Sequence, residues 1–282
     1  MLVRDFDEMK PFLPAIEMKA APSVFSDALD TAQQDLVADI LGADLEEQLE
    51  RRDEPDTKLM KLCQRAISIA AFLASIPELD VVLTDAGFGV VSNENLAPAS
   101  KDRVQALTES LQKRLDEGKD RIVTFLMRSE EYASWRGTEE FARLSDGLIL
   151  TFAEFRDVAV FSPRTAEHYP KTWSEFLRLN PAMNVALMTD VASYISREYA
   201  EELLEKIRDC ETIIPAETKV LRLVKTAVAA IALGDRDTAL GQVFKAVAIM
   251  KDAPDDFPTY SGSSAAADLT NEHSDTPIFS MF

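Results

Sequence analysis

Residues 58–67 read KLMKLCQRAI, and residues 219–228 read KVLRLVKTAV. Lysine, leucine and alanine occupy the same positions in both stretches, and apolar residues face apolar residues at most positions between them. Self-similarity at a long period is typical of a duplicated architecture. The pair therefore predicts two tandem related helical halves. The alternative is that two amphipathic helices resemble one another through patterning alone.

Two shorter similarities flank this pair, and they occur in the same order along the chain. Residues 6–10 (FDEMK) resemble residues 152–156 (FAEFR), and residues 45–49 (LEEQL) resemble residues 199–203 (YAEEL). The preserved order favours a duplication over unrelated helices of similar pattern.

The composition sets broad limits on the fold and on the partners. A chain of 282 residues with 46% hydrophobic residues suits one large domain or two of ordinary size. It has 30 Lys and Arg against 49 Asp and Glu, a formal net charge of −19. Such a charge repels phosphates and anionic lipid, so we expect no sequence-specific nucleic acid binding and no membrane partner. The basic residues at 113–121 alternate with acidic ones and predict a solvated helix face.

The cysteines and the absence of long apolar runs indicate synthesis in a reducing cytoplasm. Cys63 and Cys210 lie far apart in helical patterns, which predicts two buried free thiols. The first residues have no secretory pattern, and no run approaches the 18 or so apolar residues of a membrane span.

Helical periodicity dominates the chain and predicts a mainly α fold, a helical bundle. Breaks are expected at Gly42, Pro77 and Gly234, and within one helix at Pro181. Residues 148–152 fit either a short strand or an apolar lead-in. The expected helices span residues 23–52, 57–76, 98–132, 173–208, 217–233 and 237–250.

One segment departs from the helical pattern. Residues 79–92 combine β-branched stretches with a central Asp-Ala-Gly turn and predict a small β-hairpin. We expect a first helical half at residues 1–134 that carries this hairpin, and a second half at residues 135–251. Residues 252–282, rich in Pro, Ser, Ala and Asp, predict an extended or disordered C-terminal arm.

Binding residues gather on loops and tips that a rigid scaffold positions, so two segments are candidate partner-binding sites. The first is the hairpin loop, with Asp85, Gly87, Phe88, Gly89, Asn93 and Asn95. The second is the apolar tip of the arm, with Ile278, Phe279, Met281 and Phe282. The tip could dock into its own chain or into a neighbour, and the sequence leaves both open.

The sequence predicts no catalytic, cofactor-binding or metal-binding residues, and so no enzyme. His168 and His273 are its only histidines, too few for a histidine metal cluster or a charge-relay arrangement. It contains neither of the glycine-rich phosphate-binding motifs. The acidic clusters at residues 5–8 and 252–256 do not fit a calcium loop, and abundant acidic residues cluster by chance.

Four stretches carry a resemblance to a known family. They are LTDAGFGVVSNEN at residues 83–95, APAS at 97–100, FAEF at 152–155 and FLRLNP at 176–181. They resemble an uncharacterised family of structural proteins from phages and prophages of Bacteroides-like bacteria. The resemblance implies a head–tail adaptor or connector, a homo-oligomeric ring subunit that joins portal and tail proteins.

By this resemblance the protein would be made in the host cytoplasm and would end in the virion. Two other classes remain open. One is a cytoplasmic helical scaffold or chaperone-like binding protein. The other is an enzyme with an unrecognised carboxylate site, which would require a pocket with converging Asp or Glu residues.

Overall fold

The structure is a computed structural model that describes residues 1–13, 24–51, 57–84, 87–90, 100–211 and 213–268. The chain divides into two compact units, Met1–Ala142 (unit 1) and Arg143–Phe282 (unit 2). Both are helical, so the predicted mainly α class is confirmed. The expected division at residue 135 is too early, because Trp135 packs against Phe141 and donates a hydrogen bond from Nε1 to the Ile40 carbonyl at 2.7 Å.

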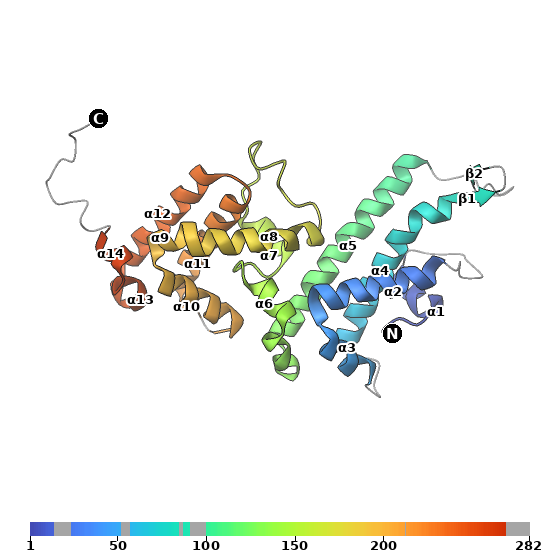
Figure 1. The fold of residues 1–282 in the computed structure, drawn as a ribbon, viewed down its shortest axis with the longest axis horizontal. Helices are drawn as coiled ribbons and strands as arrows, with labels where there is room; N and C mark the ends of the chain where they lie inside the picture. The colour runs from blue at the N-terminus through green and yellow to red at the C-terminus, as the bar shows by residue number, and fades with distance from the viewer. Residues whose placement is uncertain (14–23, 52–56, 85–86, 91–99, 212, 269–282) are drawn as a thin grey trace. The chain divides into compact units, whose positions relative to one another are not determined.

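Unit 1 is built around two long helices and the shorter helices that pack against them (Figure 1). Its elements in chain order are α1 (Phe6–Met9), η1 (Lys10–Phe12), α2 (Val24–Leu36), η2 (Val37–Leu41), α3 (Ala43–Glu50), α4 (Lys58–Asp80), β1 (Val81–Thr84), β2 (Gly87–Val90), α5 (Lys101–Arg128), η3 (Glu130–Gly137) and α6 (Glu139–Ser145), the last of which crosses into unit 2.

Helix α4 is the core helix of unit 1, and it packs against both α2 and α5. Leu59, Cys63, Ala66 and Ile67 are buried at helical spacing, as the repeated stretch predicts. By length and composition α4 could also cross a membrane, but 56% of its most apolar window is buried inside the fold.

The predicted break at Gly42 is confirmed, and its geometry is unusual. The π-helical turn η2 ends at Gly42, whose φ of 75° and ψ of 160° lie in a region that glycine alone adopts readily. Helix α3 starts at the next residue, so this glycine redirects the chain between two helices.

Unit 2 is also built from helices. Its elements are α7 (Phe152–Val158), α8 (Trp173–Val185), η4 (Ala186–Val191), α9 (Ala192–Ile195), α10 (Arg197–Arg208), α11 (Pro215–Ala232), α12 (Arg236–Asp252), η5 (Pro254–Asp256), α13 (Pro258–Ser261) and α14 (Ser264–Asp268). Helices α11 and α12 pack closely against each other, as α4 and α5 do. The stretch at 219–228 lies in α11, which corresponds to α4.

The first helices of the two units begin with the same capping arrangement. The Asp5 carboxylate accepts a hydrogen bond from the Glu8 amide, and the Glu8 carboxylate accepts one from the Arg4 amide at 2.9 Å. In unit 2 the Thr151 hydroxyl accepts from the Glu154 amide, and the Glu154 carboxylate accepts from the Leu150 amide at 3.1 Å. This pairing resembles the capping box, except that each glutamate accepts from the amide of the residue before the N-cap. It occurs at the positions that the similarity of residues 6–10 and 152–156 aligns.

A second shared feature precedes α3 and α10. Ser196 directly precedes α10 with a φ of 72° and a ψ of 153°, close to the values of Gly42 before α3. Each follows a π-helical segment, directly in unit 1 and after the short helix α9 in unit 2. These matched backbone features are not a consequence of amphipathic patterning. They support the predicted repeat.

The prediction for residues 252–282 is wrong over its first part. Residues 254–268 form three short helical segments, η5, α13 and α14, because Phe257 and Tyr260 provide buried apolar anchors. The ring of Phe257 meets that of Tyr199 edge-on at 6.0 Å. The rest of the predicted arm, residues 269–282, lies outside the described residues.

Helix α4 does not end at Pro77 as predicted, and the interruption predicted at Pro181 is absent from α8. Helix α4 continues to Asp80, since Pro77 lies in its last turn and removes only one intrahelical hydrogen bond. Helix α8 runs through Pro181, where the Asn180 amide donates to the carbonyls of Arg143 and Leu144 at 3.0 and 3.2 Å. Residues 148–151 form the predicted lead-in and not a strand.

Two predictions about exposure are wrong in part. Cys63 is buried, but Cys210 is exposed, because the chain leaves α10 there with a φ of 55°. The charged face of α5 is not solvated throughout, since Asp116, Lys119 and Asp120 are buried. Lys119 forms an ion pair with Asp39 at 2.8 Å, which compensates the cost of burying its charge.

Candidate interaction site

The first candidate site is the hairpin between α4 and α5. Strands β1 and β2 pair antiparallel, with Val81 opposite Val90 and Thr84 opposite Gly87, so the predicted hairpin is confirmed. It lies beyond the C-terminal end of α4 (Figure 1). Of the predicted contact residues, three lie on β2, namely Gly87, Phe88 and Gly89. Asp85, Asn93 and Asn95 lie outside the described residues, as does the whole apolar tip at 278–282.

The two closely packed helix pairs differ in the segment that connects their helices. In unit 1, residues 81–100 connect α4 to α5, whereas in unit 2 residues 233–235 connect α11 to α12. Gly234 makes this short connection possible with a φ of 85°. A helix pair of this kind therefore does not need the hairpin in order to form.

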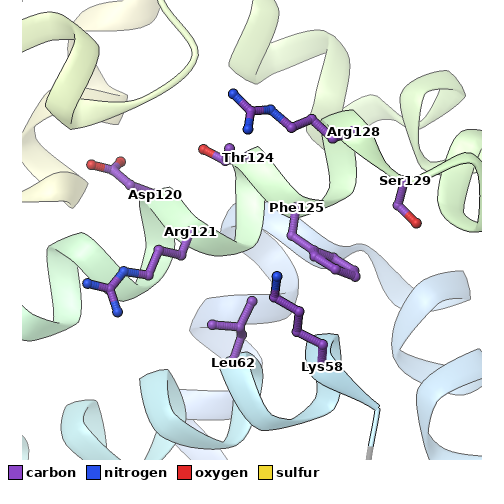
Figure 2. Close-up of a pocket in the computed structure, with 8 residues that line it drawn as sticks. All are labelled: Lys58, Leu62, Asp120, Arg121, Thr124, Phe125, Arg128 and Ser129. Carbon is purple, nitrogen blue, oxygen red and sulfur yellow. The ribbon is translucent and has the colours of Figure 1, made fainter.

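The second candidate site is a pocket of about 580 Å³ between α4 and α5 of unit 1 (Figure 2). We call it the α4–α5 pocket. Its lining combines aromatic, aliphatic, basic and acidic side chains. The residues are Lys58, Leu62, Asp120, Arg121, Thr124, Phe125, Arg128 and Ser129.

The apolar part of this pocket is formed by Leu62 and Phe125. Figure 2 shows Lys58 and Leu62 rising from α4 toward the Phe125 ring, which projects from α5. The Lys58 Nζ atom lies 5.4 Å from the centre of that ring, within the range of a cation–π contact. The cation therefore lies directly beside an apolar surface.

The pocket also has an excess of positive charge. Among the described residues, Arg121 has one ion pair, a long one with Glu117 at 3.6 Å, and both side chains are exposed. Within the described part of the chain, Lys58 and Arg128 form no ion pair. Among the lining residues that the structure describes, the one carboxylate belongs to Asp120, which is buried. Three cations against one carboxylate are notable in a chain of net charge −19.

Helical spacing places part of this chemistry on one face of α5. Arg121, Phe125 and Arg128 follow one another at i, i+4 and i+7, which brings them to the same side of the helix. Sequence reasoning missed the pocket, because it treated the charged residues at 113–121 only as a solvated helix face. The available signal was this basic–aromatic–basic spacing.

Unit 2 contains a buried polar cluster around Glu217. Lys206 donates to Glu217 at 2.7 Å and pairs with Glu202 at 2.6 Å, while the Tyr199 hydroxyl donates to Glu217 at 3.4 Å. Burial acts to lower the pKa of Lys206, but its bonds to the two glutamates outweigh burial and raise it. Burial, followed by the nearby Glu217 charge, raises the pKa of Tyr199. The cluster joins α10 to α11, so we interpret it as structural.

The other features that could carry chemistry have structural roles. Asp5 caps α1, and Asp235 caps α12 by accepting a hydrogen bond from the Thr238 amide. Burial raises the pKa of the Cys63 thiol to about 12, which keeps it protonated and unreactive at neutral pH. Among the described residues, no group of three or more His, Cys, Asp or Glu side chains is placed to hold a metal ion.

Comparison with known proteins gives one match. Residues 19–144 are similar to a family of unknown function, DUF6712. No curated protein and no solved structure matches the chain. The matched region covers most of unit 1, including the hairpin and the α4–α5 pocket, and ends close to the division between the two units.

Proposed function

We propose that this protein is a non-enzymatic phage virion structural protein, a head–tail adaptor or connector subunit that forms a ring and joins portal and tail proteins. The choice of a virion role rests on the resemblance of residues 83–95 to structural proteins of phages and prophages. A role in assembly is supported independently by the architecture of unit 1.

The observation that carries the assembly role is the hairpin inserted between α4 and α5. Unit 2 joins the corresponding helices through residues 233–235, so the helix pair does not require the insertion. A hairpin alone is marginally stable and presents backbone donors and acceptors along its edges, to which another chain can pair. A partner chain that pairs with these edges would satisfy the backbone groups and stabilise the hairpin.

The net charge of −19 is compatible with a position beside DNA that must slide without adhering. Adaptor rings form through heterologous contacts, in which one surface of a subunit meets a different surface of the next. Two units of one plan with different additions provide unlike surfaces on a single chain.

A cytoplasmic helical scaffold or chaperone-like binding protein is the second candidate. The same hairpin would then contact a client or a scaffold partner. Purified virions distinguish the two candidates, because an adaptor stays in the particle and a scaffold or chaperone does not.

The decisive experiment removes the hairpin and keeps the helices. In the variant, residues 81–100 are replaced by Leu-Gly-Asp, the connection found at 233–235. We expect a folded protein by circular dichroism that no longer binds portal or tail protein and is absent from virions by mass spectrometry. Normal incorporation of this variant would refute the role of the hairpin. Absence of the unaltered protein from virions would refute the virion role itself.

A pair of point variants provides a matched control. Phe88→Ser changes an aromatic residue on the hairpin, and Phe161→Ser changes one that is 67% exposed in unit 2. We expect only Phe88→Ser to weaken portal or tail binding. Equal weakening by both would mean that the effect is not specific to the hairpin, and the hairpin would lose its special role.

A further inference from the structure

We propose that the α4–α5 pocket binds the apolar, acidic segment 269–282 of a second copy of this chain. The choice of a second copy rests on the proposed assembly role. The choice of segment rests on the chemistry of the pocket.

The pocket requires a ligand with two properties. Leu62 and Phe125 offer an apolar surface, which an apolar side chain would cover. Lys58 and Arg128 have no anionic partner among the described residues, and Arg121 has only a long contact with Glu117. The matching ligand is an apolar segment with negative charge close by.

Residues 269–282 have both properties. They read LTNEHSDTPIFSMF, with Glu272 and Asp275 and no lysine or arginine. The acidic residues lie three to ten positions before the apolar residues Ile278, Phe279, Met281 and Phe282. An apolar side chain can thus reach Phe125 while a carboxylate meets Arg121 or Arg128.

The dimensions fit a peptide segment better than a broad protein surface. A pocket of about 580 Å³ holds two or three large side chains, and ligand sites generally span ~300–1,000 Å³. The described chain ends at Asp268, and the ten residues to Ile278 reach at most about 35 Å when extended. That reach is long enough for the segment to extend to a neighbouring subunit.

Two further pockets among the described residues do not combine an apolar surface with unpaired positive charge. One, of about 280 Å³, lies beside Tyr194 and Leu240, and its Asp190 and Arg236 already pair at 3.6 Å. The other contains Lys225, which is paired with Glu154 at 2.5 Å. Neither offers a surplus charge that would select an occupant.

The first experiment measures binding of a fluorescent peptide of residues 269–282 to a chain that lacks those residues. We expect saturable binding that weakens with salt. Arg128→Glu should weaken it about tenfold, because a favourable charge contact becomes repulsive. Arg103→Glu, the same change at an exposed position near the start of α5, should leave it within about twofold. No binding, or equal loss in both variants, would overturn the proposal.

A peptide with Phe279→Ala and Phe282→Ala tests the apolar half of the interaction. It should bind about tenfold more weakly than the native peptide, because two large side chains no longer cover the Phe125 surface. Binding that survives this change would mean that charge alone attracts the peptide, and the pocket would not be its site.

The second experiment distinguishes a neighbour from the same chain. The truncated chain retains the pocket, and the full chain with Arg128→Glu retains the segment. By light scattering after size exclusion, each variant alone should be monomeric, and the mixture should form a one-to-one complex. If the full chain is monomeric and the mixture forms no complex, the segment does not join two copies and the proposal is refuted.

These results separate the inference from the proposed function. If the variants disturb self-association as expected but the protein is absent from virions, the pocket inference holds and the virion role fails. If the protein is in virions and the truncated chain is incorporated and assembled normally, the virion role holds and the pocket inference fails.

Discussion

The substitution Ser196→Gly should stabilise unit 2, although it removes a helix cap. Ser196 has a φ of 72° and a ψ of 153°, a conformation that is almost restricted to glycine and costs other residues ~1–3 kcal/mol. Its hydroxyl accepts a hydrogen bond from the Tyr199 amide at 3.1 Å. Replacing a serine cap by glycine costs only a few tenths of a kcal/mol.

The net effect follows from these opposing contributions. Glycine also makes the unfolded chain more flexible, which costs about 0.4–1 kcal/mol. The strain relieved is larger than the sum of the lost cap and the added entropy of the unfolded chain. We therefore expect the free energy of unfolding to rise by roughly 1 kcal/mol. For a unit of this size, 1 kcal/mol raises Tm by roughly 2–4 °C.

The measurement is urea and thermal unfolding of the full chain, followed by circular dichroism. Ser196→Ala is the matched control, because it keeps the strain and loses the cap, and it should destabilise by about 1 kcal/mol. Gly42→Ala is the reverse change in unit 1. It creates the strain and places a Cβ atom 2.7 Å from a Glu140 carboxylate oxygen, so it should destabilise by roughly 1–3 kcal/mol. If Ser196→Gly is as destabilising as Ser196→Ala, the strain argument is wrong.

Three further predictions concern single side chains. In the native protein iodoacetamide should label only Cys210, which is exposed, and urea should expose Cys63; rapid labelling of both in the native state would contradict its burial. Trp135→Phe should destabilise unit 1 by about 1–3 kcal/mol in urea unfolding, because the buried Ile40 carbonyl loses its donor. Lys206→Met should cost about 1–3 kcal/mol at pH 7. Because its glutamate partners raise the pKa of Lys206, its contribution is present below the ordinary value of 10.5 and is lost as pH rises through the folded pKa. Measured by denaturation across pH, the deficit of this variant should therefore shrink above that value.

Much of the helical plan could be predicted from local patterns. Apolar spacing gives α4 and α11, and the glycines at 42 and 234 mark two breaks, because both adopt positive φ. Local rules failed at Pro77 and Pro181, where a single missing hydrogen bond is too small a loss to end a helix that packing holds.

Other misses have a tertiary cause. Lys119 is buried because Asp39, eighty positions earlier, pairs with it, and no local pattern contains that partner. Residues 254–268 have the composition of a coil, yet Phe257 and Tyr260 anchor them in the core of unit 2. Buried contacts between distant residues decide such segments.

Of the two candidate sites, the hairpin could be predicted from local sequence, whereas the pocket could not. The hairpin follows from β-branched residues around a turn, which is local information. The α4–α5 pocket requires Lys58 and Phe125 to meet across two helices, which only the packed structure shows. Spacing along α5 alone indicates a basic–aromatic face, not a cavity.

The unequal connections between the paired helices have an evolutionary consequence. Lengthening a connection from three residues, as at 233–235, to twenty, as at 81–100, adds only about 2 kcal/mol of closure entropy. A lineage could gain, exchange or lose a recognition element at this junction while the folding of the helix pair stays nearly unchanged. The junction after α11 is therefore a natural place to graft a foreign peptide epitope, because the helix pair of unit 1 forms with a connection of twenty residues.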